Sequence, residues 1–150
     1  DALRKTFIDV IDALIYLKDE KLNYIFVNRA TERFYDKTAD EMIGKDDYML
    51  SEAEFAQTRR QSDIAVLKKM SLVTGEAEWD GRIYKTAKFP VELPDGQFGV
   101  GAYITDITEE REHERKQEKA LLSDLRIRKA MELAMEKEQV LAQVQELVLI

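Results

Sequence analysis

The chain has 150 residues, of which 45% are hydrophobic and 35% charged, and its formal net charge at pH 7 is −7. Such an acidic chain is a poor partner for nucleic acids and anionic membranes, because those surfaces attract clustered Lys and Arg. The sequence contains no Cys and one His, which excludes disulfides, thiolate catalysis and Cys-ligated zinc and is typical of a reducing, cytoplasmic compartment.

Gly and Pro divide the chain into two parts. The last of them is Gly101, and no residue from Ala102 onward breaks a helix. We expect an N-terminal amphipathic helix within residues 1–11, a folded domain over residues 12–108 and a helical linker over residues 109–150. No apolar run approaches the length of a membrane span, so we expect no membrane contact by this segment.

Hydrophobic periodicity predicts the elements of the first part in chain order. Apolar residues at helical spacing predict a short amphipathic helix over Leu3–Leu14. Runs of aromatic and β-branched residues predict five strands, at Ile15–Lys18, Tyr24–Asn28, Glu76–Asp80, Arg82–Val91 and Phe98–Thr105. Between the second and third strands, runs of helix formers predict three helices, at Arg29–Tyr35, Asp40–Ile43 and Glu52–Met70. This order predicts an α+β fold, a five-stranded antiparallel sheet with helices on one face.

Short stretches at the joints between these elements match a known pattern. They are Tyr16–Asp19, Tyr24–Ala30, Glu41–Asp47, Asp63–Leu67 and Asp106–Glu109. The first two resemble the opening hairpin and helix start of the PAS domain family, and the next two resemble helices of one PAS subfamily. The last resembles the Asp-Ile-Thr ending that joins PAS cores to output helices. The resemblance implies a PAS sensory domain over residues 12–108, with any ligand between the concave sheet face and the helices.

Alternation along the strands predicts which side chains face the helices. In the last strand, the positions of the apolar residues predict which side chains face inward. In the first strand, an outward Asp19 places Lys18 on the inner face and, by alternation, Tyr16 as well. The expected inward residues are Tyr16, Lys18, Val100, Ala102 and Ile104. The expected outward residues are Ile15, Leu17, Tyr103 and Thr105.

Lys18 is the most informative inward residue, because a buried Lys is rare unless it is paired. Asp47 and Asp63 are its candidate partners, and Asp46 is a weaker one. Three interpretations stay open: the ammonium reaches solvent at the strand end, it pairs with a carboxylate in the core, or it binds a small anionic ligand. Trp79 is interpreted first as a core aromatic. The candidate ligand-binding residues are Tyr16, Lys18, Asp47, Asp63, Trp79, Ala102 and Ile104.

Asp106 and Thr108 are the candidate residues for signal transmission. They lie where the last predicted strand passes into the linker, and both side chains can cap a helix that begins there. Glu109 suits the positive N-terminus of that helix. Structural capping and a signalling role are compatible, and both stay open.

We expect no cofactor and no metal. Flavin–thiol photochemistry and a thioester-bound chromophore both need a Cys, and haem usually needs a His in its pocket. The only His is His113, in the expected linker. A non-covalently bound flavin, or a haem with a Met or Tyr ligand, stays open.

We also expect no enzyme activity. The chain has no Gly-rich phosphate loop. His113-Glu114-Arg115 superficially resembles the phosphoacceptor box of histidine kinases, but the Pro of that box is missing, since no Pro follows Pro94.

The linker combines strong helix formers with two apolar rows. Members of the first row are four, three and seven residues apart, and Glu138 and Gln145 occupy the positions between them. We predict a parallel coiled coil, with a change of phase between Leu121 and Ile127, that makes the protein a homodimer. A lone helix packed on its own core is the alternative. The rows are Ile127, Met131, Ala134, Leu141 and Val148, and Leu133, Val140, Val144 and Leu147.

The expected function is that of a sensory input module of a bacterial signal-transduction receptor. A small ligand or a change in the pocket would act through the dimeric linker on an output domain in the same chain. That output would be the histidine kinase of a two-component system, a diguanylate cyclase or a similar domain. The alternatives are a ligand-free dimerisation or scaffolding module and a flavin or haem redox sensor.

Overall fold

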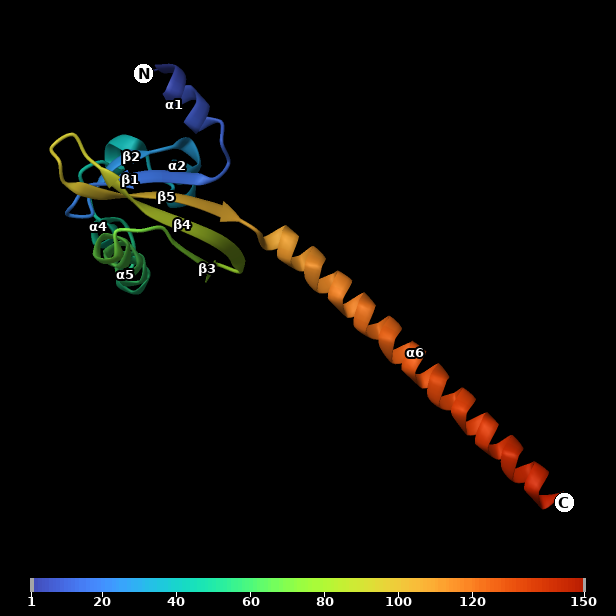
Figure 1. Cartoon of the computed structure of the whole chain (residues 1–150). Helices are drawn as coiled ribbons and strands as arrows, with labels where there is room; N and C mark the ends of the chain where they lie inside the picture. The colour runs from blue at the N-terminus through green and yellow to red at the C-terminus, as the bar shows by residue number, and fades with distance from the viewer. Residues whose placement is uncertain (1, 150) are drawn as a thin grey trace. The chain divides into compact units, whose positions relative to one another are not determined.

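The computed structural model describes residues 2–149. Figure 1 shows the elements in chain order: α1 (Ala2–Asp9), β1 (Leu14–Lys18), β2 (Tyr24–Val27), α2 (Arg29–Tyr35), α3 (Ala39–Met42), α4 (Asp47–Leu50), α5 (Ala53–Lys69), β3 (Val73–Trp79), β4 (Arg82–Glu92), β5 (Phe98–Asp106) and α6 (Thr108–Val148). The described residues divide into two units, one that ends at Thr108 and one that begins at Glu109. None of the helices among residues 2–149 is long and apolar enough to cross a bilayer.

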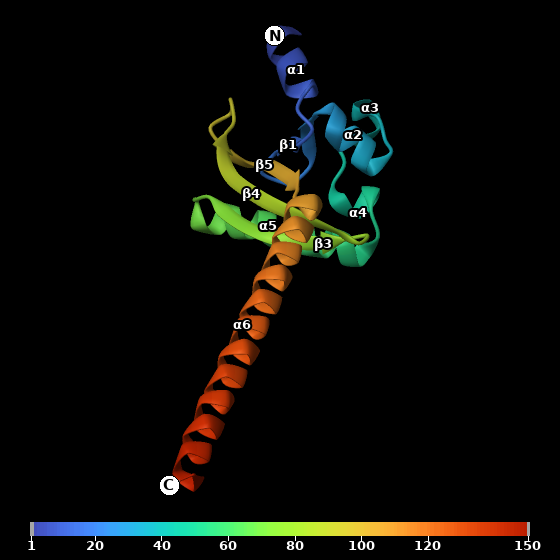
Figure 2. The same ribbon diagram turned by 90° about the vertical axis from the view of Figure 1, so that its right-hand side faces the viewer.

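The first unit is built on one five-stranded sheet whose strand order is β2-β1-β5-β4-β3. Every neighbouring pair is antiparallel, and β1 lies beside β5 from Leu14↔Ile104 to Lys18↔Val100. In Figure 2 the sheet is curved, and α2, α3 and α4 lie on one side of it. The predicted α+β fold, with its antiparallel sheet, helices and long C-terminal helix, is confirmed.

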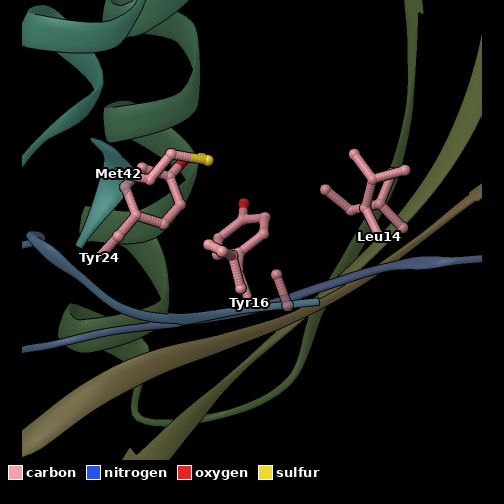
Figure 3. Packing of buried hydrophobic residues seen from close by; sticks show 7 residues of the cluster. Leu14, Tyr16, Tyr24 and Met42 are labelled. Atoms are coloured by element: carbon pink, nitrogen blue, oxygen red, sulfur yellow. The ribbon is translucent and has the colours of Figure 1, made fainter. Parts of the chain in front are cut away.

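Alternation along β1 and β5 determines the inner face of the sheet, as predicted. The inward side chains of Tyr16, Lys18 and Val100 are at most 1% exposed, whereas outward Tyr103 is 44% exposed. Figure 3 shows Tyr16 on β1, and Tyr24 beside Met42 of α3. The apolar cluster that these residues belong to is Leu14, Tyr16, Tyr24, Val27, Met42, Ala102 and Ile104.

Asn28 joins the hairpin to the helices because its amide has both donors and an acceptor. Its Oδ1 accepts from the backbone N–H of Thr31, which caps α2, and from the backbone N–H of Ile15 in β1. Its Nδ2 donates to the carbonyl of Ala13 over 2.8 Å. A fully buried side chain thus fixes the entry into α2 relative to β1.

Two predicted elements differ from the structure by more than one residue, and one helix was not predicted. The helix predicted over Leu3–Leu14 ends at Asp9, and Leu14 begins β1, because an apolar residue there satisfies both a helical and a strand pattern. The strand predicted from Glu76 begins at Val73. The short helix α4 was not predicted, since its four residues are too few to show a period.

We expect Gly99→Ala to lower the free energy of unfolding by about 1–3 kcal/mol, since a Cβ at residue 99 would lie 2.0 Å from the carbonyl oxygen of Lys18 and would push β5 away from β1. Gly75→Ala is the matched control, because its Cβ would lie 3.6 Å from Thr86 Oγ1, an ordinary contact. Urea unfolding of the two variants measures the difference. Equal loss in both would mean that the close approach at Gly99 is not a constraint.

Candidate functional site

Lys18 lies at the end of β1 with its ammonium between two helices. Its Nζ is 2.5 Å from Asp47 Oδ2 on α4 and 2.5 Å from Asp63 Oδ2 on α5. All three side chains are fully buried. The predicted pairing of Lys18 inside the core is therefore confirmed, with both candidate partners instead of one, and the interpretation that Lys18 reaches solvent is wrong.

The remaining oxygens of the two carboxylates are also bonded. Asp47 Oδ1 accepts a 2.6 Å hydrogen bond from the hydroxyl of Tyr24, whose oxygen lies 3.0 Å from that of Tyr35. Asp63 Oδ1 accepts from Lys88 Nζ of β4 over 2.7 Å. A buried ion pair is favourable only when its other polar atoms are satisfied in this way.

Lys88 was missed by the sequence analysis. Its side chain is 4% exposed, and its ammonium also donates to Ser62 Oγ over 2.7 Å. Burial lowers the pKa of Lys88, and Asp63 opposes that shift. Strand alternation offers one signal for Lys88: in an antiparallel sheet it lies directly opposite the inward Ala102 of β5.

Cations set the ionisation of Asp63, whereas burial sets that of the nearby phenols. Burial alone would raise the pKa of Asp63, but Lys88 and Lys18 and their hydrogen bonds outweigh burial, so this pKa lies below its ordinary value. Burial raises the pKa of Tyr16 to about 12 and that of Tyr24 well above its ordinary value. Both phenols therefore stay neutral at pH 7.

Asp46, the weaker candidate partner, does not reach Lys18. It caps α4 by accepting from the backbone N–H of Met49, and its Oδ2 lies 3.9 Å from Arg60 Nη1. Its neighbour Asp47 points inward because consecutive residues of a helix face different directions.

A cavity of about 530 Å³ lies between α5 and strands β3, β4 and β5. This volume is in the range of small-molecule sites. Trp79 and Ile104 are the two predicted ligand-binding residues that line it; Tyr16, Lys18, Asp47, Asp63 and Ala102 are not among its lining residues. Trp79 is 42% exposed and its ring centre is 4.3 Å from that of Phe55, so it forms an edge of the cavity. A role in ligand binding stays a prediction for all seven.

Arg59 of α5 also lines the cavity and was not predicted. Its guanidinium carbon lies 4.8 Å from the ring centre of Phe55, 5.3 Å from that of Tyr35 and 5.5 Å from that of Phe34. Its Nη1 and the hydroxyl of Tyr16 are buried and have no hydrogen-bond partner. No pattern in the sequence indicates Arg59, because Arg59 and Arg60 are adjacent and either one could face inward.

Asp106 and Thr108 form a compact junction at the end of β5. Thr108 Oγ1 accepts from the backbone N–H of Ile83 over 2.9 Å and donates to Asp106 Oδ1 over 2.6 Å. Asp106 also accepts from the backbone N–H of Thr108 and from Arg82 Nε. Slight burial would raise the pKa of Asp106, but the bonds from Arg82 and Thr108 lower it. Asp106 thus accepts from the backbone N–H of the first residue of α6, whereas the Thr108 hydroxyl bonds Ile83 and Asp106. A signalling role stays a prediction for both residues.

Within residues 2–149 there is no group of three or more His, Asp or Glu side chains that could hold a metal ion.

Comparison with known proteins gives a consistent result. A family model described as the PAS fold matches residues 8–112. The methanogenesis regulatory histidine kinase FilI of Methanothrix harundinacea is 32% identical over 114 residues, a match that covers 70% of this chain and 13% of that protein. The chain thus spans a small part of that relative.

Two solved structures show the same fold. The PAS domain of Bordetella pertussis BvgS has a TM-score of 0.60 at 21% identity, over 81% of this chain and 96% of that one. The phage VqmA–DPO complex has a TM-score of 0.61 at 21% identity, over 81% of this chain and 60% of that one. At these identities the likeness concerns the fold alone.

Lys18→Met should lower the free energy of unfolding by roughly 3–5 kcal/mol, because it leaves Asp47 buried without a cation. Asp47→Asn should also destabilise, and the double variant should lose at least about 1 kcal/mol less than the sum of the single losses. Lys45→Met, at an exposed position, is the control and should have little effect. Urea unfolding measures all four. Strict additivity of the Lys18 and Asp47 effects would show that the two charges do not interact.

Proposed function

The chain belongs to the PAS fold family, and on that premise we propose that it is the sensory input module of a longer bacterial receptor. A small molecule occupies the cavity beside α5, and its presence changes the position of the strands that wall the cavity. The change passes through Asp106 and Thr108 into α6 and from there to an output domain further along the same chain. The proposed role is sensory and not catalytic.

The observation that carries this proposal is that one strand serves both the cavity and the junction. Tyr84, Thr86 and Lys88 of β4 line the cavity. Arg82 and Ile83, at the start of the same strand, hold Asp106 and Thr108 by side-chain and backbone hydrogen bonds. These hydrogen bonds would pass a shift of β4 to Asp106 and Thr108, at the end of the first unit.

We propose a histidine kinase as the output, because the curated relative is a regulatory histidine kinase. A diguanylate cyclase is the second output class that a helical linker could serve.

The segment would act in the cytoplasm, without contact to membrane or nucleic acid. We propose no flavin or haem, so the purified protein should be colourless.

The α6 helix supports a proposed homodimer. Its large apolar side chains are 47–78% exposed in the single chain. A lone helix gains too little from intrinsic propensity to leave two apolar rows in water, and a second copy of α6 would cover them. The exposed large apolar residues of α6 are Leu121, Leu122, Leu125, Ile127, Met131, Leu133, Met135, Val140, Leu141, Val144, Leu147 and Val148.

The cavity proposal predicts that a small molecule co-purifies with the protein and is released on denaturation, where mass spectrometry detects it. Thr86→Trp should abolish its retention, because the larger side chain fills the cavity that Thr86 lines. Thr105→Trp, on the opposite face of the neighbouring strand, is the control and should retain it. If neither the unmodified protein nor the control carries or takes up any small molecule, the module is a ligand-free scaffold.

The dimer proposal predicts that truncation after Glu110 lowers the mass seen by sedimentation or weakens the dimer. Within the full chain, Leu141→Lys places a charge in the seam and should weaken the dimer. Gln143→Lys adds the same charge two residues away, on the opposite side of the heptad, and should not. A truncated chain that dimerises as tightly as the full chain would place the interface in the first unit instead.

A further inference from the structure

We infer that the cavity takes a ligand with one acidic group and an apolar body, with the acidic group bound beside Arg59. This inference rests on the proposed function, because it names the chemical class of the molecule that the cavity would sense. It follows from the charge balance of the core, the unused donors at Arg59 and the character of the cavity wall.

The charges on the inner side of the sheet do not balance. Two carboxylates, Asp47 and Asp63, lie among three cations, Lys18, Lys88 and Arg59. Lys18 binds both carboxylates, and Lys88 binds Asp63. Among residues 2–149 no carboxylate forms an ion pair with Arg59, so it is the one cation of the three that is not paired. A cation shielded from water is costly unless an anion compensates it.

The surroundings of Arg59 compensate it only in part. The rings of Phe34, Tyr35 and Phe55 lie within 5.5 Å of the guanidinium carbon, and attraction between a cation and a ring face stabilises the charge. Ring faces do not satisfy N–H donors, however, and Nη1 is buried without an acceptor. A carboxylate supplies the negative charge and two acceptor oxygens in the planar arrangement that a guanidinium matches.

Lys88 also lines the cavity, but it is a weaker anchor for an anion. Its ammonium is already bonded to Asp63 and Ser62 at 2.7 Å each. Arg59 therefore provides the unsatisfied charge, whereas Lys88 belongs to the ion network that holds α5 against the sheet.

The other lining residues favour a ligand whose body is apolar and that carries no second negative charge. Phe55 and Trp79 present aromatic surface along the cavity. Glu52, Glu54, Glu76 and Glu78 are exposed lining residues, so they meet the ligand where the cavity opens to solvent. A second carboxylate at that end would lie near these like charges and would be disfavoured.

Three probes of equal chain length test the inference: octanoate, octanamide and octanedioate. Trp79 is the single Trp of the chain and borders the cavity, so its fluorescence, excited at a wavelength where the probes are transparent, reports binding. Octanoate should bind about ten-fold or more tightly than octanamide, which cannot form the charge-assisted bonds, and more tightly than octanedioate. These measurements use the unmodified full chain and do not depend on any variant folding.

Arg59→Met should reduce the affinity for octanoate by about ten-fold or more and change the affinity for octanamide little. Arg60→Met is the matched control, because Arg60 lies next in the sequence but contacts Asp46 and the ring of Tyr48 and does not line the cavity. It should leave both affinities unchanged. Arg59→Lys, which keeps the charge, should fall between the unmodified protein and Arg59→Met.

The outcomes separate this inference from the proposed function. Equal binding of octanoate and octanamide, or no effect of Arg59→Met, would overturn the acidic-ligand inference while leaving the cavity as a small-molecule site. Binding of none of the three probes would also overturn the inference. A sensory cavity would then still be supported if a small molecule co-purifies with the unmodified protein and is lost in Thr86→Trp. If no small molecule co-purifies and no probe binds, the proposed function is wrong as well.

Discussion

The fold of the first unit depends on one ammonium group, that of Lys18, held between Asp47 and Asp63. A Lys in this position leaves water completely, and it is tolerated because two carboxylates from two helices bind it. The contact fixes α4 and α5 against the sheet from β1, while Lys88 repeats the attachment of α5 from β4. Because α5 forms one wall of the cavity, the shape of the cavity depends on these charges as well as on apolar packing.

The ion network and the cavity have different physical roles. In the network each carboxylate oxygen has a bonding partner, which makes that part of the core rigid. At the cavity, Arg59 has an N–H donor that no group of the described chain accepts. The satisfied groups therefore position the helix, and the unsatisfied guanidinium lies where a ligand is proposed to bind.

The sequence predicted the sheet and three of the four ions of the network, Lys18, Asp47 and Asp63. Strand alternation placed Tyr16, Lys18 and Ala102 correctly, because one face of this sheet is buried and the two-residue period then has a strong physical meaning. Lys88 and Arg59 were missed for a different reason. Each lies in a segment with other cations, Lys85 and Arg60, and a charged residue normally indicates solvent, so composition does not show which one of a pair is buried. Strand register distinguishes Lys88, opposite inward Ala102, from Lys85, opposite outward Thr105, whereas only the packing of α5 on the sheet distinguishes Arg59 from Arg60.

The two layers of the domain carry opposite charges at their contact. Both cations of the network, Lys18 and Lys88, belong to the sheet, and both carboxylates, Asp47 and Asp63, belong to the helices. During evolution such a contact resists change one residue at a time, because losing any member leaves an opposite charge buried and unmatched. Exchange for an apolar core requires paired substitutions in both layers, so members of this lineage should keep the whole set or lose a cation and a carboxylate together.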